Sequence, residues 1–391
     1  MSKTKIGVLG CGTIADVYVG NLVERVDNVE VAACSDVRPE AAKALSEKYH
    51  IPRVRSFEEM LADPEIVLIL NLTIPAVHYD LNMKALAAGK HVYCEKPFAV
   101  TFEEVQKSMS FAAEKGLLLT CAPDTFLGYG VQTARKLIDE GEIGAPVGFS
   151  ANMMYNGPDL WHPTAEFYYA PGGGPMLDMG PYYLSALCYL LGPIKSIFCV
   201  SRKGREERLI HGKMIPVEIP TSYACVVEMA SGAVGNVNMS FDVWHSDLPK
   251  IEIYGQSGAL SVPDPNMFGG KVSLIRGGEV EEVVNGTQGG PFDKLIAMMR
   301  GTAEAYHEVA DSPFPQPDER LNMRGLGVSD ACAALSEGRG VRVRGEMAMH
   351  IAEALEGVDI SAREGRPYIM TTSFERTAPM PENVPLYAVD P

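Results

Sequence analysis

Apolar runs alternate with amphipathic stretches along the first third of the chain. Five runs are apolar over most of their length and predict buried strands: KIGVLG (5–10), VEVAACSD (29–36), EIVLILNLT (65–73), HVYCEKP (91–97) and LLLTCAP (117–123). Between them, apolar residues recur every three or four positions, which predicts helices over 13–26, 39–49, 76–89 and 101–116. Strands buried on both faces and joined by helices are typical of a parallel, doubly wound α/β sheet, which binds ligands beyond the carboxyl ends of its strands.

The pattern changes after residue 123. Strand-like segments separated by turns predict a mostly antiparallel sheet over 146–156, 194–202, 221–242, 250–262 and 271–284. Helical spacing returns at 319–337 and 346–358. We expect the proline-rich tail after Arg366 to lie along the surface or on a partner subunit.

Length and composition limit the class of protein. A chain of 391 residues exceeds what one hydrophobic core usually serves, which indicates two domains. The net charge of −16 repels phosphate backbones and anionic lipid, so we expect neither a nucleic-acid nor a membrane partner. The eight cysteines show no C-x-x-C pair and lie mostly in apolar runs, as expected of buried thiols in a cytoplasmic protein. No metal-ligand spacing stands out, so we expect no metal.

The first strand leads into GCGTIA, which fits the pattern G-x-G-x-x-G/A. Gly10 permits the tight turn, and Gly12 lets a pyrophosphate approach backbone N–H groups at the start of a helix. Ala15 lets that helix pack closely on the strand. The expected cofactor contacts in this loop also include Thr13 and Ile14.

Asp36 ends the second predicted strand. A carboxylate there accepts hydrogen bonds from the adenosine ribose and repels a 2′-phosphate, which favours NAD. Arg38, two residues later, keeps NADP as an alternative because it can pair with that phosphate. The alternative for the whole loop is a purely structural strand-to-helix turn that binds no ligand.

A longer stretch, TIPAVHYDLNMKALAAGKHVYCEKPFAVTFEE (73–104), together with GCGTIA resembles the Gfo/Idh/MocA family of NAD(P)-dependent sugar and cyclitol oxidoreductases. Residues 172–194 and 250–262 resemble two later motifs of the family, so the resemblance covers nearly the whole chain. It implies a Rossmann domain at 1–123 and, at 124–391, a substrate-binding α+β domain on a large open, mostly antiparallel sheet. It also implies a homodimer or homotetramer paired through these sheets.

The resemblance assigns roles to residues after the third and fourth strands. In the family, the lysine of Glu95-Lys96-Pro97 lies near the nicotinamide and the reacting hydroxyl, where an ammonium stabilises a developing alkoxide. The motif suggests a cis peptide before Pro97. By the same matching, Thr73, Pro75 and His78 fall near the nicotinamide ribose, and Glu95 and Lys96 complete the cofactor contacts. Without the family, His78 is a solvent-facing residue at a helix start.

The second motif departs from the family. Its usual form is D-x-x-x-H with histidine as general base, whereas this chain has Asp178 followed four residues later by Tyr182. On a helix the two share one face, so we expect both to point toward Lys96. A phenol beside a cationic lysine can relay a proton, and Asp178 then positions substrate or Lys96. The alternative is that Tyr182 and Tyr183 begin a core helix. We expect the glycines at 172–174 to let the chain approach cofactor or substrate.

Two histidines are candidates for the missing base. The only two tryptophans of the chain each precede a histidine, as Trp161-His162 and Trp244-His245. Aromatic faces beside polar groups suit sugars, so we expect Trp161, His162 and His245 to contact substrate, with His162 as reserve base. Loop anchoring is the alternative for both histidines. Asp124 follows the last strand of the first domain and is expected to face the cleft, or else to cap a helix.

These observations predict an NAD(P)-dependent dehydrogenase or reductase that acts on a secondary alcohol of a sugar, glycoside or cyclitol. Lys96 and Tyr182 are expected to handle the hydroxyl proton. Two alternatives stay open: an NAD-dependent glycoside-cleaving enzyme that oxidises its sugar transiently, and a non-catalytic sensor that shares the fold. The presence of both Lys96 and Asp178 argues against the sensor.

Overall fold

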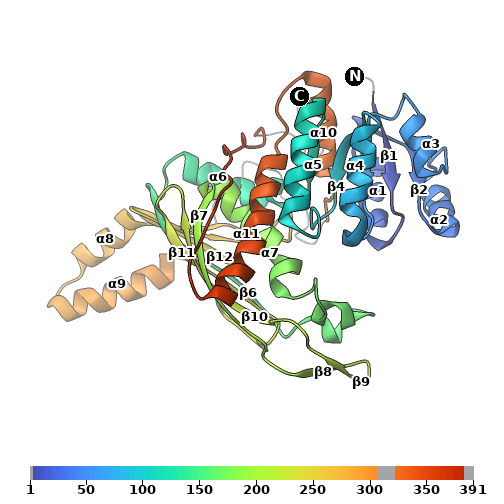
Figure 1. Cartoon of the computed structure of the whole chain (residues 1–391). Helices are drawn as coiled ribbons and strands as arrows, with labels where there is room; N and C mark the ends of the chain where they lie inside the picture. The colour runs from blue at the N-terminus through green and yellow to red at the C-terminus, as the bar shows by residue number, and fades with distance from the viewer. Residues whose placement is uncertain (1–2, 306–321, 383–391) are drawn as a thin grey trace. The chain divides into compact units, whose positions relative to one another are not determined.

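A computed structural model describes residues 3–305 and 322–382 and divides into two compact units (Figure 1). Within that part of the chain, the first unit holds everything up to Leu127, then Asn322–Glu356 and the segment from Thr371. The second unit runs from Gly128 to the first gap and also includes Gly357–Met370. The C-terminal part of the chain therefore contributes to both units.

The first unit is built on a parallel sheet with strand order β2-β1-β3-β4-β5. Its strands are β1 (Thr4–Leu9), β2 (Val29–Ser35), β3 (Leu68–Asn71), β4 (His91–Cys94) and β5 (Leu119–Cys121). The helices between them are α1 (Thr13–Arg25), α2 (Pro39–Tyr49), α3 (Phe57–Ala62), the 3₁₀ turn η1 (Pro75–Val77), α4 (His78–Ala87) and α5 (Phe102–Lys115). A further 3₁₀ turn, η2 (Thr125–Leu127), ends the first segment. The predicted doubly wound sheet is confirmed.

Local sequence explains where these helices begin and end. Helix α5 starts with a capping box, in which Thr101 and Glu104 satisfy each other's backbone N–H groups, and it stops at Gly116 in the left-handed conformation. Helix α3 has the same box between Ser56 and Glu59. Helix α3 was not predicted from the sequence, because its six residues are too few to show a helical period.

Two helices from the C-terminal part of the chain belong wholly or partly to the first unit: α10 (Leu326–Glu337) and the beginning of α11 (Gly345–Glu364). Helix α10 is anchored by Asp330, whose buried carboxylate accepts hydrogen bonds from Arg342 at 2.5 Å (backbone) and 2.7 Å (side chain). Glu353 of α11 holds the segment that begins at Thr371. Its carboxylate accepts hydrogen bonds from the backbone N–H and the hydroxyl of Thr371. The start of the proline-rich tail thus packs on its own chain.

The second unit is built on a mixed sheet with strand order β14-β13-β12-β6-β11-β10-β7-β15. All its neighbours are antiparallel except the parallel pair β6 and β11, so the predicted mostly antiparallel sheet is confirmed. Its strands are β6 (Pro146–Met154), β7 (Ile194–Arg202), β10 (Ser222–Met229), β11 (Val234–Ser240), β12 (Ile251–Gly255), β13 (Gly258–Val262), β14 (Ser273–Arg276) and β15 (Tyr368–Ile369).

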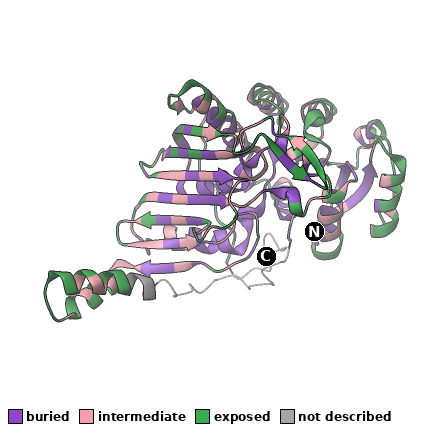
Figure 2. Cartoon of the chain, turned by 90° about the horizontal axis from the view of Figure 1, so that it is seen from below, coloured by how far each residue is buried: buried purple, intermediate pink, exposed green. Residues whose placement is uncertain are grey.

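One face of this sheet is covered and the other is open. Helices α6 (Tyr129–Asp139) and α7 (Pro175–Leu191) pack on the sheet, and buried and exposed residues alternate along its strands (Figure 2). On β7 and β10, for example, Cys199 and Cys225 are buried, whereas the next residue of each strand, Val200 and Val226, is more than half exposed. The open face therefore carries apolar side chains in contact with solvent.

The strand predicted over 271–284 is wrong for its second half. Strand β14 stops at Arg276, and the chain continues as helix α8 (Gly277–Gly286), followed by α9 (Pro291–Ala305). The β-branched valines at 280, 283 and 284 favour a strand by composition, but their spacing places them along one side of a helix. Helices α8 and α9 lie against each other (Figure 1), and this packing outweighs strand propensity.

Candidate functional site

The glycine-rich loop lies between β1 and the start of α1. Gly10 has φ of +92°, and a Cβ there would fall 2.7 Å from the backbone of Leu72, so only glycine fits. A Cβ on Gly12 would meet no atom within 4 Å, so space is open in front of the helix. Gly12 is the N-cap of α1, and no side chain caps its N–H groups. An uncapped helix start with open space before it is suited to a phosphate group.

Asp36, at the end of β2, is directed back to this loop. One of its carboxylate oxygens accepts from the backbone N–H of Cys11 at 2.7 Å, and the other accepts from the N–H of Arg38 at 2.8 Å. Burial opposes ionisation, but these hydrogen bonds and the Arg38 charge together hold the pKa of Asp36 below its usual range. The Arg38 side chain is 61% exposed, so it is accessible to a ligand. The pair therefore offers both a ribose acceptor and a phosphate partner.

The loop after β3 is set by a buried asparagine. Asn71 Oδ1 accepts from the hydroxyl of Thr73 at 2.6 Å, and Asn71 Nδ2 donates to Asn82 of α4 at 2.8 Å. Pro75 follows as the exposed first residue of η1. Thr73 and Pro75 thus stand at the carboxyl edge of the sheet, as the sequence predicts. Asn71 was not predicted as part of the site, although its place at the end of an apolar run was an available signal.

His78 is buried, and its ring bridges two loops. Nδ1 lies 2.7 Å from the carbonyl oxygen of Pro97, and Nε2 lies 3.0 Å from that of Thr73. Because carbonyl oxygens only accept hydrogen bonds, both nitrogens must donate, which requires an imidazolium. Burial favours the neutral ring, but the neighbouring Cys94 and the two carbonyls outweigh it and raise the pKa of His78 to about 9. The solvent-facing alternative is wrong, because the residue is 0% exposed.

Glu95 and Lys96 follow β4 directly. Glu95 is 7% exposed; one carboxylate oxygen accepts from the hydroxyl of Tyr18 at 2.7 Å, and the other accepts from the backbone N–H of Lys96 at 2.8 Å. The next peptide, Lys96-Pro97, is cis, as the motif suggested. Glu95 therefore orients the backbone of the lysine. Tyr18 could not be predicted from local sequence, because its partner lies 77 residues away.

Asp178 and Tyr182 both lie on α7, which begins at Pro175, so the four-residue spacing places them one turn apart on the same side of one helix. Asp178 is half-buried, Tyr182 is 7% exposed and Tyr183 is fully buried. The hydroxyl of Tyr183 faces the carbonyl of Asn152 at 3.4 Å, in the core. Tyr182 and Tyr183 are thus both buried, as the core-helix alternative expects, whereas Asp178 is half-buried.

Two of the three glycines before α7 lie close to other parts of the same chain. A Cβ on Gly173 would lie 2.5 Å from the carbonyl oxygen of Phe167, and Gly174 donates its N–H to the carbonyl of Tyr168 at 2.8 Å. These two glycines therefore approach residues 158–169, called the aromatic segment below, which belong to the same chain. At Gly172 the φ of +90° explains the glycine, since its Cβ would meet no neighbour within 4 Å.

Trp161 and His162 belong to that aromatic segment, between the 3₁₀ turns η3 (Pro158–Leu160) and η4 (Ala165–Tyr169). The His162 ring lies 5.2–5.4 Å from the rings of Trp161, Phe167 and Tyr168, edge to face with each. Trp161 is 63% exposed. Tyr155 follows β6 directly. Burial, and after it the negative charge of nearby Asp178, raises the pKa of Tyr155. The segment and the start of α7 thus share one neighbourhood within the second unit.

The two remaining predicted substrate contacts are His245 and Asp124. His245 lies on an exposed loop with Nε2 3.0 Å from Asp247 Oδ1. Asp124 is 1% exposed, and one of its oxygens accepts from the N–H groups of Gly325 and Gly327 at 3.0 and 2.9 Å. It therefore caps the start of α10, and burial raises its pKa to about 6 despite these bonds. Capping is the alternative that the sequence left open, although the first capped N–H group, that of Gly325, lies 201 residues downstream.

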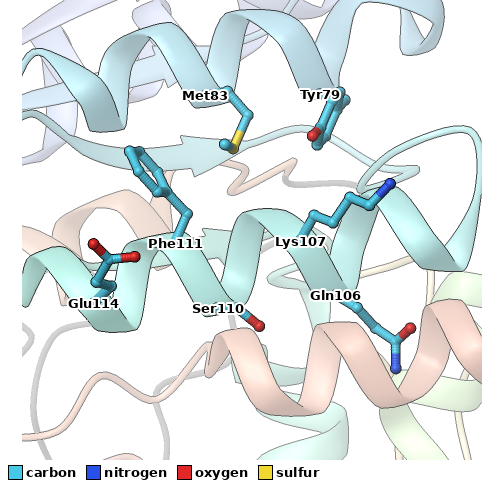
Figure 3. A pocket seen from close by; sticks show the side chains of 7 residues that line it. All are labelled: Tyr79, Met83, Gln106, Lys107, Ser110, Phe111 and Glu114. Atoms are coloured by element: carbon cyan, nitrogen blue, oxygen red, sulfur yellow. The ribbon is translucent and has the colours of Figure 1, made fainter.

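A groove on the first unit lies away from these side chains. It runs between α4 and α5 and is lined by Tyr79 and Met83 on one side and by Gln106, Lys107, Ser110, Phe111 and Glu114 on the other (Figure 3). None of these residues was predicted for the site. Lys107 is paired with Glu103 at 2.6 Å, and the groove is open to solvent along its length. We therefore place the site at the strand ends rather than in this groove.

Two kinds of feature are absent from residues 3–305 and 322–382. No helix there is both long and apolar enough to cross a membrane. No group of three or more histidine, cysteine or acidic side chains in the same part of the chain is arranged to hold a metal ion.

The two units match two family models in sequence. Residues 4–122 match the oxidoreductase family model described as an NAD-binding Rossmann fold, and residues 131–261 match the GFO/IDH/MocA C-terminal domain. Together the two matches cover more than half of the chain and include the glycine-rich loop, Lys96, Asp178 and Tyr182.

Individual relatives agree with these matches. The chain is 25% identical over 338 residues to scyllo-inositol 2-dehydrogenase (NADP(+)) of Bacillus subtilis, covering 82% of this chain and 90% of that protein. It is 31% identical over 204 residues to an uncharacterized oxidoreductase of Schizosaccharomyces pombe, with 50% of this chain and 54% of that protein covered. This alignment thus spans only about half of the fungal protein.

Among solved structures, levoglucosan dehydrogenase in complex with NADH and L-sorbose superposes with a TM-score of 0.75 at 18% identity, covering 95% of this chain and 100% of that one. At this identity the likeness concerns the fold. Together with the two family models and the glycine-rich loop described above, it leads to one conclusion: the chain is a member of the GFO/IDH/MocA oxidoreductase family.

Proposed function

We propose that this protein is an NAD(P)-dependent dehydrogenase or reductase that interconverts a secondary alcohol and a ketone on a sugar, glycoside or cyclitol. The observation that carries the proposal is the retention of Lys96, ordered by Glu95, in a chain that belongs to an oxidoreductase family. Relatives named as inositol dehydrogenases and sugar reductases support the substrate class.

The first unit fits a nicotinamide dinucleotide. The uncapped start of α1 and the open space at Gly12 suit the pyrophosphate, with Thr13, Ile14 and Ala15 in the first turn. Asp36 is the expected ribose acceptor, which favours NAD, while the accessible Arg38 leaves NADP as the alternative. Thr73, Pro75, Glu95 and Lys96 stand along the strand ends where the nicotinamide half is expected. His78 is fully buried with both ring nitrogens bonded to carbonyls, so we expect it to hold the loops there rather than to contact the cofactor. When bound, this cofactor supplies hydride transfer.

The chain's own residues would then handle the proton. The ammonium of Lys96 holds the substrate hydroxyl and stabilises negative charge on its oxygen. The phenol of Tyr182 relays the hydroxyl proton, and Asp178, one turn earlier on α7, orients substrate or Lys96. His162 is the reserve base, and Trp161 and His245 are the proposed sugar contacts. Asp124 is left out of the mechanism, because its carboxylate caps α10.

A screen tests the proposal directly. The purified protein is mixed with NAD or NADP and with myo-inositol, scyllo-inositol, levoglucosan, D-glucose or D-galactose, and reduced cofactor is followed at its near-ultraviolet absorbance. We expect turnover with at least one polyol and a clear preference for one cofactor. Cofactor binding without turnover of any polyol, in either direction, would instead favour the sensor.

The glycoside-cleaving alternative makes a different prediction in the same screen. It would release an aglycone from a nitrophenyl glycoside without net formation of reduced cofactor. The relatives reported above are named as dehydrogenases or oxidoreductases, and none of those names favours this alternative. We therefore keep it only as an outcome of the screen.

The proposal includes a homodimer or homotetramer in the cytoplasm, joined through the open face of the large sheet. Val200 and Val226 are 60% and 54% exposed on that face, and Phe198 beside them is 37% exposed. Light scattering on the wild type and on a Val200→Lys, Val226→Lys variant tests this. We expect an oligomer that the paired lysines dissociate, whereas a monomeric wild type would contradict the assembly.

A further inference from the structure

The hairpin of β8 (Glu207–Ile210) and β9 (Lys213–Pro216) carries a buried arginine. The two strands pair only with each other in the described structure (Figure 1), and β8 packs against η3. Arg208 and Ile210 are buried, whereas Leu209 between them is 64% exposed, so Arg208 is on the inner side of the hairpin. A fully buried arginine requires several acceptors to compensate for its lost hydration.

The guanidinium joins two segments that are far apart in sequence. One terminal nitrogen donates to the carbonyl of Asn156 at 2.7 Å and to Asp159 at 2.9 Å, at the start of the aromatic segment. The other donates to Asp242 at 2.6 Å and to the carbonyl of Phe241, just after β11. Arg208 thus ties the beginning of the aromatic segment to the end of a sheet strand.

The same group also reaches the end of the aromatic segment. The Tyr169 ring centre lies 5.0 Å from the guanidinium carbon, and the Tyr169 hydroxyl donates to Asp159. Asp159 and Tyr169 enclose the stretch that contains Trp161, His162 and Phe167. Arg208 therefore contacts both ends of this stretch. The rings of Trp161 and Phe167, which lie between these ends, are 63% and 53% exposed.

Neighbouring contacts make the support rigid. The second oxygen of Asp242 accepts from the hydroxyls of Thr221 and Ser222 at 2.6 and 2.9 Å, which anchors it to the sheet. On the hairpin, His211 Nε2 lies 3.0 Å from the carbonyl oxygen of His162. The aromatic segment is thus held at both ends and near its centre.

The energetics favour a role beyond stability. The cost of removing two charged groups from water offsets much of the attraction in a buried ion pair. Apolar side chains of similar volume often stabilise a protein equally well. What a guanidinium adds is direction, because its planar donors fix several acceptors in one geometry. A network of one cation and two carboxylates therefore suits the task of holding a loop in a single conformation.

We propose that Arg208 is a positioning residue that holds the aromatic segment 158–169 in the conformation that meets substrate. This inference rests on the proposed function, since that function makes Trp161 and His162 substrate contacts. It predicts that loosening Arg208 weakens substrate binding and leaves cofactor binding unchanged. The chemical step, which depends on other residues, should change little.

The test uses Arg208→Lys, which keeps the charge but not the planar donors, and Asp242→Asn, which keeps the side-chain shape. Lys213→Gln, on the exposed edge of the same hairpin, is the matched control. In a Trp244→Phe background Trp161 is the only tryptophan, so its anisotropy decay reports the motion of the segment without any substrate. We expect the fast-decay amplitude to at least double in Arg208→Lys and Asp242→Asn, and to stay unchanged in the control.

Kinetics with the first polyol from the screen provide the second measurement. We expect KM to rise at least tenfold in Arg208→Lys, with kcat reduced less than threefold and the Kd for NAD within twofold of wild type. Unchanged anisotropy in both Arg208→Lys and Asp242→Asn would overturn the holding role. Increased anisotropy with unchanged KM would overturn the link to substrate. A protein that turns over no polyol refutes the proposed function, and anisotropy still decides whether Arg208 holds the segment.

Discussion

The hydroxyl of Tyr18, on α1, donates to the carboxylate of Glu95, after β4, at 2.7 Å, and both side chains are buried. The other carboxylate oxygen of Glu95 accepts from the backbone of Lys96 at 2.8 Å. The helix that begins at the glycine-rich loop therefore also orients Glu95, whose carboxylate in turn holds the backbone of Lys96, the predicted catalytic lysine.

Removing the Tyr18 hydroxyl should destabilise the first unit. In Tyr18→Phe the buried carboxylate of Glu95 loses a donor, which costs about 1–3 kcal/mol of unfolding free energy. Urea unfolding measures the loss. Tyr49→Phe is the matched control, because the Tyr49 hydroxyl bonds Asp16 in a partly solvated place and should cost less. Equal losses in the two variants would show that Glu95 finds another donor.

Lys96→Ala should reduce turnover strongly without abolishing cofactor binding. The ammonium is expected to act on the substrate hydroxyl, so kcat should fall by about 10²–10⁴-fold. The Kd for NAD, measured by fluorescence titration, should change much less. Lys107→Ala, whose side chain pairs with Glu103 on α5, is the control for removing a lysine from the same unit. Near-normal turnover in Lys96→Ala would refute the role.

Tyr182→Phe and Tyr183→Phe form a matched pair on α7. If the Tyr182 phenol relays the proton, its loss should reduce kcat by about 10²-fold or more. Tyr183 is a core residue with a long contact to Asn152, so Tyr183→Phe should keep nearly full activity. Steady-state kinetics of both variants and of His162→Ala decide the assignment. Full activity in Tyr182→Phe with a large loss in His162→Ala would transfer the role to His162.

Asp36 should control the choice of cofactor. Replacing Asp36 by Ser removes the charge that repels a 2′-phosphate and leaves Arg38 free of its carboxylate neighbour. We expect the ratio of kcat/KM for NADP to that for NAD to rise by about 10-fold or more, equivalent to about 1.4 kcal/mol. The Arg38→Ala variant in the same background should reverse the gain. If this NADP-to-NAD ratio of kcat/KM stays constant, a residue other than Asp36 distinguishes the two cofactors at the ribose.

The contact between α11 and the tail segment should weaken in acid. His350 is buried with Nδ1 2.8 Å from the Thr372 hydroxyl, and burial lowers its pKa from 6.5 to about 4. A depressed folded-state pKa contributes stability that is fully present above about pH 6.5 and lost as pH falls toward 4. Burial opposes ionisation of Glu353 nearby, but the hydrogen bonds from Thr371 and Thr372 outweigh it and lower its pKa, which adds a loss in the same direction.

The measurement is the pH dependence of Tm for wild type and for His350→Asn, which keeps a polar partner for Thr372 but does not titrate. Between pH 6.5 and 4 the wild type should lose more stability than the variant. Parallel curves would show that His350 titrates as in the unfolded chain.

Local patterns in the sequence determined much of this protein. Five apolar runs predicted the parallel sheet, because burial on both faces leaves a mark in every strand residue. The loop GCGTIA showed the need for glycine at position 10, where φ is +92°. The spacing of Asp178 and Tyr182 placed them on one face of a helix, since that relation depends only on the helical period.

Tertiary structure decided what depends on partners distant in sequence. The roles of Asp124 and His78 depend on groups they meet only in the folded chain: the start of α10 for one, two loop carbonyls for the other. The partners of Arg208 come from two segments far apart in sequence. Helix α8 forms despite its valines because α9 packs on it. Periodicity reports which face of an element is buried. It carries no information on which other element covers that face, and burial against a specific neighbour sets both hydrogen-bond partners and pKa.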